Sequence, residues 1–344
     1  MGAAHRSLIG GDNRLLRVLY SFTNGTDGKR PQAGLLAASD GALYGTTSAG
    51  SSNRGIVFKI DTDGGGFQIL HTFTGKPDGQ QPTCKLVEGS DGALYGTTQG
   101  GGTSLGGTVF KINKDGNGYG ILYNFVGGSG ASLPYAGLIK GSDGFLYGTT
   151  YYGPGFDFVG TIFQISEDGL SYQTQYSFPA TGDLQGPAGE LLEGPDNALY
   201  GVAGRSLASP YSGGIFKVNK DGSDYTVLRA FGSIPDGAAP NCALVELNNI
   251  FYGTTEMGGT LGFGCVFALS SSPLPPRITS LATSGTTNTL QIVATSASQF
   301  AVERSTNLAD WSVITTLTSP LSCQTNFPDL GPPQPSAFYR LHQH

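Results

Sequence analysis

Residues 90–112 read SDGALYGTTQGGGTSLGGTVFKI, and versions of this stretch occur five times in the chain. Each copy has a Leu-Tyr-Gly or Phe-Tyr-Gly core followed by a Val-Phe or Ile-Phe core, and each core recurs every 51 to 53 residues. Self-similarity at a fixed period of this size indicates a repeat architecture. The core tyrosines are Tyr44, Tyr95, Tyr147, Tyr200 and Tyr252, and the core phenylalanines are Phe58, Phe110, Phe163, Phe216 and Phe267.

Each copy predicts four short β-strands, which in the first repeat cover residues 35–39, 42–47, 56–61 and 67–73. Asp-Gly pairs such as Asp40-Gly41 and Asp63-Gly64 supply the positive φ that tight hairpins need. Because both hairpin turns of a repeat fall at the same end of its strands, the long Gly-rich loops are expected together at the other end. The sequence therefore predicts an all-β fold made of five four-stranded blades.

The first and last repeats complement each other. Arg14–Phe22 reads as the fourth strand of a repeat without its first three strands, whereas the last repeat (strands 243–247, 250–255 and 264–269) has no fourth strand. We therefore predict that Arg14–Phe22 pairs with Gly264–Leu269. This pairing would close residues 14–270 into a five-bladed β-propeller and remove an exposed sheet edge.

The tail differs from the repeats. Residues 270–276 (SSSPLPP) have the composition of a semi-rigid linker. Residues 277–344 alternate apolar and polar residues in segments such as LQIVA and FAVERS, and they contain Trp311, the only tryptophan. This pattern predicts a separate small β-sandwich over residues 277–344.

Composition argues against several function classes. The net charge is −6 and there is no basic run, which is unlike a nucleic-acid-binding protein. No stretch of about 18 apolar residues predicts a membrane span, and no signal peptide is recognisable in the sequence as given. The chain has four histidines, and three of them lie near its ends. The repeats therefore lack the histidines that a Ser-His-Asp catalytic triad or a His-ligated zinc site requires. We predict no cofactor and no metal site.

The pattern LYGTT…GG…GTVFKI…DG resembles the choice-of-anchor tandem-repeat family called GloVer, a β-propeller family of bacterial secreted and surface proteins. The tail motifs SxNLxxW (Ser305–Trp311), FPD (Phe327–Asp329) and FYR (Phe338–Arg340) resemble fibronectin-III-like C-terminal modules of secreted bacterial proteins. Both resemblances imply an exported protein, at the cell surface or secreted. Neither implies a defined reaction or a set of catalytic residues.

Candidate ligand-binding positions follow a proline that enters the innermost strand of each repeat. The residue after this proline differs from repeat to repeat, as in a binding surface: Gln32, Thr83, Tyr135, Ala188 and Asn241. Among the five residues that stand two positions further on, only Lys85 and Glu190 are charged. Their side chains could form an ion pair with each other, or they could act as a general acid and a general base. Tyr151 and Tyr152, on a neighbouring loop, could stack on a sugar ring or fill the seam between repeats.

Carboxylates stand four residues before four of these prolines: Asp27, Asp78, Asp183 and Asp236. Asp-Gly sequences usually begin a turn, and a ring of carboxylates that binds a cation or a sugar is the alternative interpretation.

Three functions remain open at this stage. The favoured one is an exported module that binds a carbohydrate or other small polar ligand over the central channel, through Gln32, Thr83, Lys85, Tyr135, Glu190, Asn241, Tyr151 and Tyr152. The alternative is a carbohydrate-active enzyme. A glycoside hydrolase would use Glu190 with a loop carboxylate (Asp183, Asp236 or Glu256), and a lyase would use Tyr135 or Lys85 as its base. A structural surface protein is the third.

Overall fold

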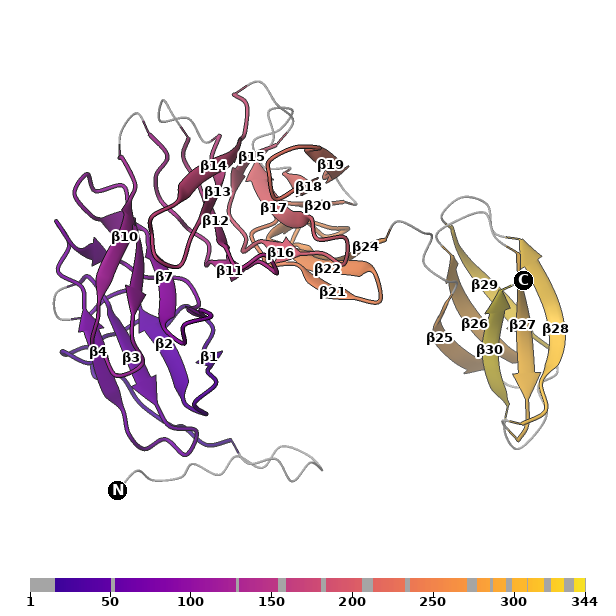
Figure 1. Ribbon diagram of the computed structural model, residues 1–344. Helices are drawn as coiled ribbons and strands as arrows, with labels where there is room; N and C mark the ends of the chain where they lie inside the picture. Colours follow the sequence, from indigo (N-terminus) through magenta and orange to yellow (C-terminus); the bar gives the residue numbers. More distant parts are fainter. Residues whose placement is uncertain are drawn as a thin grey trace. The chain divides into compact units, whose positions relative to one another are not determined.

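The computed structural model describes residues 16–50, 53–127, 130–153, 159–180, 184–205, 213–232, 236–270, 277–284, 287–294, 299–307, 309–318, 323–330 and 337–343. Within these residues the chain is all-β, with thirty strands and no helix. It forms two compact units, Met1–Ala268 and Leu269–His344, whose strands Figure 1 labels in chain order.

Four of the five sequence repeats form an antiparallel sheet in which four repeat strands follow one another in chain order, and in the fourth repeat a short fifth strand, β15 (Gln185–Pro187), joins the same sheet. The first repeat sheet is β1 (Leu36–Ala37), β2 (Leu43–Thr47), β3 (Ile56–Ile60) and β4 (Gln68–Thr72). The second is β6 (Val87–Glu88), β7 (Leu94–Thr98), β9 (Thr108–Ile112) and β10 (Gly120–Asn124). The third is β11 (Ile139–Lys140), β12 (Leu146–Thr150), β13 (Thr161–Ile165) and β14 (Tyr172–Ser177). The fourth is β16 (Leu192–Glu193), β17 (Leu199–Arg205), β18 (Gly214–Val218) and β19 (Thr226–Ala230).

The fifth repeat has three strands: β21 (Val245–Leu247), β22 (Ile250–Thr255) and β24 (Cys265–Ser270). Shorter strands fix the long loops at the end of the sheets opposite the hairpin turns, which we call the loop end. There β5 (Gly79–Gln80) pairs with β8 (Gly100–Gly101), β15 (Gln185–Pro187) with β17, and β20 (Gly237–Ala238) with β23 (Met257–Gly258).

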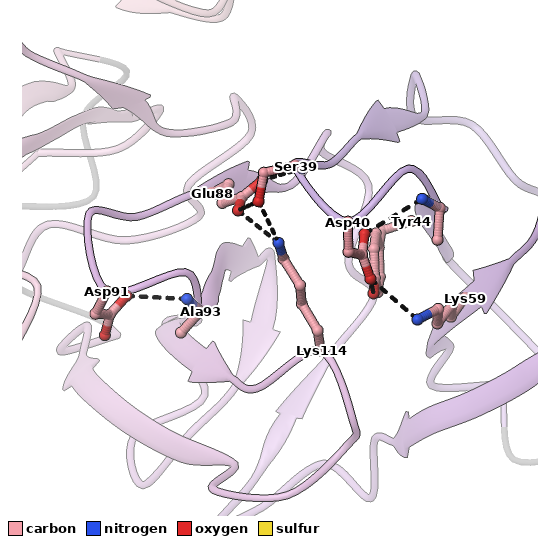
Figure 2. A network of polar contacts seen from close by, with 9 residues as sticks. Ser39, Asp40, Tyr44, Lys59, Glu88, Asp91, Ala93 and Lys114 are labelled. Carbon is pink, nitrogen blue, oxygen red and sulfur yellow. Dashed lines mark hydrogen bonds and ion pairs between the residues drawn. The ribbon is translucent and has the colours of Figure 1, made fainter.

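The repeated sequence motif builds a local cluster of the core tyrosine and the turn aspartate in the first four repeats, which Figure 2 shows for the first. The fifth repeat has Asn248 in place of this aspartate. The buried Tyr44 donates its hydroxyl proton to Asp40 of the Asp-Gly turn at 2.8 Å, and Lys59 of the Val-Phe-Lys-Ile strand lies 3.1 Å from the same carboxylate. Desolvation acts to raise the pKa of Asp40, but the hydrogen bonds from Tyr44 and Lys59 outweigh it and hold the pKa at about 2. The motif thus ties each turn to its two central strands.

The glycine of the Leu-Tyr-Gly core makes room for the core phenylalanine on the next strand. In the second repeat Gly96 is the register partner of Phe110, and a Cβ on Gly96 would lie 2.7 Å from the ring carbon Cζ. All five repeats share this arrangement, with corresponding distances of 2.4–2.7 Å. The ring of Phe110 is fully buried, so this contact is part of the core that lies between sheets.

Aromatic rings fill the seams between neighbouring repeat sheets. A residue on the fourth strand of one repeat stacks on a ring at the start of the fourth strand of the next. The stacked pairs are His71–Tyr119 at 3.6 Å, Tyr123–Tyr172 at 3.6 Å and Tyr176–Tyr225 at 4.3 Å between ring centroids.

A second set of contacts joins neighbouring repeats near the hairpin turns. Glu88 of the second repeat accepts hydrogen bonds from the backbone N–H and the hydroxyl of Ser39 in the first, at 2.8 and 2.5 Å, while Lys114 binds Glu88 at 2.5 Å (Figure 2). We call this contact the seam clamp. Glu193, Ser142 and Lys220 repeat it between the fourth and third repeats.

The N-terminal segment, residues 16–22, forms the side-chain contacts of a fourth strand but no strand pairing. Tyr20 stacks on Phe67 at 3.8 Å, as His71 stacks on Tyr119 one repeat later, and Phe22 packs edge-on against Phe58 at 5.3 Å. Among the described residues β24 pairs with β22 alone. The predicted pairing of Arg14–Phe22 with Gly264–Leu269 is therefore not confirmed by the described residues 16–22, which show only the side-chain half of the expected contact, on the first repeat.

The second unit contains two antiparallel three-stranded sheets. One is β25 (Arg277–Ser284), β26 (Thr287–Ala294) and β29 (Cys323–Asp329), and the other is β28 (Ser312–Thr318), β27 (Gln299–Ser305) and β30 (Phe338–Gln343). Both sheets contribute to one core around Leu290, Ile292 and Val302. Asp329 accepts two hydrogen bonds at 2.8 Å from Arg304 and one at 2.7 Å from Tyr339, and it thereby ties β29 to β27 and β30.

Candidate functional site

The variable residue after each entry proline meets a second variable residue of the same repeat, at the loop end of the sheet. In the first repeat the Ser48 hydroxyl donates to the Gln32 side-chain oxygen at 2.8 Å, and in the second the Gln99 amide donates to the Thr83 hydroxyl at 2.8 Å. We call each such couple a loop-end pair. The second member directly follows the Thr-Thr dipeptide of the second repeat strand, or Val202-Ala203 in the fourth repeat. These residues are Ser48, Gln99, Tyr151, Gly204 and Glu256.

The other repeats have loop-end pairs of different chemistry. In the third repeat the rings of Tyr135 and Tyr151 lie 5.1 Å apart. In the fifth, Asn241 donates its amide proton to Glu256 at 3.0 Å. The fourth repeat has the small residues Ala188 and Gly204, and a Cβ on Gly204 would lie 2.7 Å from the Asn241 side-chain oxygen. Each repeat therefore presents a different chemical surface at one equivalent place.

The first two loop-end pairs line a depression of about 520 Å³. A volume of this size is in the range of small-molecule sites. Its lining comes from the first and second repeats and is almost entirely polar: Lys29, Arg30, Gln32, Ser48, Ala49, Asn53, Gln81, Thr83 and Gln99.

The backbone holds this lining in place. Arg30 and Gln81 each precede an entry proline and have φ values of +57° and +59°, a region that side chains rarely adopt. Their carbonyl oxygens accept hydrogen bonds from the backbone N–H groups of Ser48 (3.1 Å) and Gln99 (3.2 Å). Unusual backbone geometry of this kind persists only where the surroundings fix it, so the side chains around the depression project from a rigid frame.

Three tyrosines of the third repeat lie together beside the second repeat. Tyr151 contacts Tyr135 on one side and Tyr152 on the other, with 5.4 Å between the centroids of the two adjacent tyrosines. Burial acts to raise the pKa of the Tyr135 phenol, and the two neighbouring tyrosines add to this effect. The Cys84 thiol donates to the Tyr135 carbonyl at 2.9 Å, so the innermost strands of the second and third repeats are neighbours. Tyr135 itself is exposed.

Lys85 and Glu190 lie near each other without forming an ion pair among the described residues. A Cβ on Gly137, which lies between them, would be 3.5 Å from the Glu190 carboxyl carbon and 3.2 Å from the Lys85 carbonyl oxygen. Burial raises the pKa of Glu190 above its usual range, and the positive charge of Lys85 opposes this only in part. Glu190 is thus a candidate proton donor, and of the two alternatives for Lys85 and Glu190 the direct ion pair is not formed among the described residues.

The predicted loop carboxylates that the structure describes are all engaged by groups of the loop itself or of the adjoining strands. Asp27 accepts from the backbone and hydroxyl of Thr23, both at 2.7 Å, and Asp236 forms an ion pair with Arg229 at 2.5 Å. Asp78 faces His71 at 3.1 Å and also accepts from Tyr119. These contacts fasten turns, which favours the turn interpretation over a ring of free carboxylates; Asp183 lies outside the described residues.

Sequence reasoning identified the first members of the loop-end pairs and missed most of the second members. Ser48 and Gln99 vary between repeats just as Gln32 and Thr83 do, and this variation was the available signal. Lys29, Arg30 and Gln81 were missed because they stand before the entry proline rather than after it. Of the eight predicted ligand-binding residues, only Gln32 and Thr83 line the depression; the others, outside its lining, are Lys85, Tyr135, Tyr151, Tyr152, Glu190 and Asn241.

The described residues contain no helix that is long and apolar enough to cross a membrane. Nor do the described residues bring three or more His, Cys, Asp or Glu side chains together as a metal site would.

Fold and site together define an all-β repeat protein with a variable polar surface at the loop end of its sheets. The chain belongs to the Gloeobacter/Verrucomicrobia repeat family, whose model matches residues 9–202 and 134–299. This match confirms the resemblance that the repeat motif indicated. No curated protein matches the chain.

Solved structures give only distant similarities. An exo-β-1,3-galactanase from Phanerochaete chrysosporium is 10% identical, with 91% of this chain and 92% of that one covered and a TM-score of 0.44. A β-1,3-galactosidase of family GH43 is 13% identical over 73% of this chain and 58% of that one, with a TM-score of 0.43. A nidogen/laminin complex is 15% identical over 64% of this chain and 70% of that one, with a TM-score of 0.44.

Proposed function

We propose that the chain is a carbohydrate-binding module whose ligand lies at the loop end of the first three repeats. The observation that carries this proposal is the depression lined by two polar loop-end pairs, Gln32–Ser48 and Thr83–Gln99. Amides and hydroxyls both donate and accept hydrogen bonds, as the hydroxyl groups of a sugar do. Tyr135, Tyr151 and Tyr152 supply ring faces on which the apolar side of a sugar can stack.

The proposal includes a closed architecture and an extracellular location. Residues 14–270 form a five-bladed β-propeller closed by the N-terminal segment, and residues 277–344 form an independent fibronectin-III-like domain. In this architecture the mouth of the central channel is surrounded by Gln32, Thr83, Lys85, Tyr135, Glu190 and Asn241. The proposed location of the protein is outside the cell or at the cell surface. The side-chain packing of Tyr20 and Phe22 on the first repeat supports closure.

Binding is tested with a glycan array followed by titration calorimetry of the best ligand. Replacing Gln99 by Ala removes one side chain of the lining, so affinity should fall by a factor that corresponds to about 1 kcal/mol or more. Gln173→Ala is the matched control, because Gln173 is an exposed glutamine on β14. Equal affinity of the Gln99→Ala variant and the wild type would contradict the assignment. An array without any binder would favour a structural surface role instead.

A second candidate function, glycoside hydrolysis, rests on Glu190. Its raised pKa and its place beside Lys85 are properties of a general acid. Glu190→Gln keeps the shape of the side chain and removes its proton transfer, so an enzyme would lose turnover by orders of magnitude in a reducing-sugar assay. A pure binding module would show no turnover in the wild type either, and its ligand affinity would change little or moderately.

A further inference from the structure

The depression in the first unit has a distinctive charge. Its described lining contains two cations, Lys29 and Arg30, and no carboxylate. The whole chain, by contrast, carries a net charge of −6. Local positive charge in an acidic chain favours contact with an anionic ligand.

Neither cation is neutralised by a neighbour. In the described part of the chain no ion pair or hydrogen bond involves the ammonium group of Lys29 or the guanidinium group of Arg30. In contrast, ion pairs are formed by Lys59, Lys111, Lys114, Lys140, Lys217 and Lys220. The nearest carboxylate in sequence, Asp27, is taken up by the backbone and hydroxyl of Thr23, the backbone of Gly25 and the hydroxyl of Tyr20. The two positive charges are therefore available to a ligand.

The backbone that carries both cations is held in place by hydrogen bonds. Lys29 exchanges two backbone hydrogen bonds with Ala49, at 2.7 and 3.3 Å, and the Arg30 carbonyl accepts from Ser48 at 3.1 Å. The positive φ of Arg30 sets the direction in which its side chain leaves the chain. Because this backbone is already ordered, ligand binding has to order only the two side chains and not the loop that carries them.

We propose that this depression binds the anionic group of an acidic carbohydrate, a carboxylate or sulfate carried on a sugar ring. Lys29 and Arg30 bind the anion, for which the planar Arg guanidinium is suited because it can donate two parallel hydrogen bonds to a carboxylate or sulfate. Gln32, Gln81 and Gln99 bind the hydroxyl groups around it. This inference rests on the proposed carbohydrate-binding function and names the class of ligand.

The test is titration calorimetry of the full chain with three ligands of equal length: an oligogalacturonate, a sulfated galacto-oligosaccharide and a neutral galacto-oligosaccharide. An acidic ligand should bind at least tenfold more tightly than the neutral one, and its affinity should fall as salt is raised. The Lys29→Gln, Arg30→Gln double variant should lose about 10- to 100-fold in affinity for the acidic ligand, as expected for charge-assisted hydrogen bonds. Its affinity for the neutral ligand should hardly change.

Two controls accompany this variant. Lys29→Arg with Arg30→Lys keeps both charges and should retain the preference for the acidic ligand. Lys76→Gln removes an exposed charge outside the lining and should leave all affinities within about twofold, which excludes a general effect of net charge.

The outcomes separate this inference from the proposed function. If the neutral ligand binds as tightly as both acidic ones, the chain binds carbohydrate but the inference is wrong. If the double variant binds the acidic ligand as the wild type does, the site is wrong. If none of the ligands and no glycan on the array binds, the proposed function itself fails. Comparison of the galacturonate and the sulfated ligand identifies which anion is preferred.

Discussion

At the scale of single residues, the repeat motif is explained by space and hydrogen bonding. The core glycine is needed because the phenylalanine ring of the next strand occupies the place of its Cβ. The core tyrosine is needed because its hydroxyl binds the aspartate of the turn while its ring fills the core. The core glycine and the core tyrosine of the repeat thus have packing roles, and they are not available for ligand binding.

Gly96→Ala should destabilise the first unit by about 1–3 kcal/mol, because the new methyl group would meet the buried Phe110 ring at 2.7 Å. Gly120→Ala is the matched control, since a Cβ at Gly120 on β10 meets no atom within 4 Å. The control should be neutral or slightly stabilising, because alanine restricts the unfolded chain. Urea denaturation measures both variants, and equal stability of the two would contradict the packing argument.

Asp78 gives a pH-dependent contribution to stability. Desolvation acts to raise its pKa, but hydrogen bonds from His71, Tyr119, Thr74 and Gly79 lower it to about 2 in the folded chain, against about 4 in an unfolded one. A folded pKa below the unfolded value stabilises the fold above about pH 4, and this contribution is lost as the pH falls toward about 2. Asp78→Asn should therefore be less stable than the wild type at pH 7, and the gap should narrow at pH 2–3. Denaturation at both pH values tests this; an unchanged gap would refute it.

At the scale of strands and seams, the second and third repeats show a seam clamp with exchanged charges. Lys140 takes the place of Glu88 and Glu193, and Glu167 takes the place of Lys114 and Lys220. The contact persists, because the Ser90 backbone donates to Glu167 at 2.7 Å and Lys140 donates to the Ser90 hydroxyl at 2.6 Å. The position equivalent to Ser90 in the fourth repeat is Pro195, which has no N–H and no hydroxyl, so this clamp cannot form toward the fifth repeat.

Lys140→Glu should weaken this seam, because it places a carboxylate beside Glu167. The expected loss is about 0.5–1 kcal/mol, as both side chains are partly exposed. Adding Glu167→Lys should restore stability, since the double variant has the charge order of the second and fourth repeats. A double-mutant cycle by chemical denaturation measures the coupling, and strictly additive effects would show that the two residues act independently.

The repeats, the strands and the Asp-Gly turns could be predicted from the sequence because each depends on contacts within one repeat. The loop-end pairs could not, because the contact of Ser48 with Gln32 depends on how the long loops fold back on the strand end. The role of Asp27 and Asp78 could not be predicted either, because an aspartate at such a position can stabilise a turn or bind a ligand. Spacing identifies positions, but it does not show which side chains are already hydrogen-bonded.

At the scale of the whole first unit, the fifth repeat lacks the cover that the other repeats have. Val266 on β24 is 79% exposed, whereas Val57 and Val109, which occupy the same repeat position, are 0% exposed. Val245 and Leu247 on β21 are exposed as well. Leu16 and Val18, in the N-terminal segment that packs on the first repeat, are also exposed. The sheet of the fifth repeat has an apolar edge, and the N-terminal segment is apolar and has no strand partner. Pairing of the segment with this edge would bury the apolar side chains of both.

Closure is therefore expected to make Val266 a core residue. Val266→Asp should destabilise a closed unit by roughly 2–5 kcal/mol, because it would bury an unpaired charge between β24 and the N-terminal segment. The same change at Val126, which is exposed in the second repeat, should cost much less. Deleting residues 1–22 should itself cause a large loss of thermal stability, and Val266→Asp should add little to it, because the deletion already uncovers the edge. If Val266→Asp and Val126→Asp melt together in the full chain, β24 has no cover in solution and the unit is open.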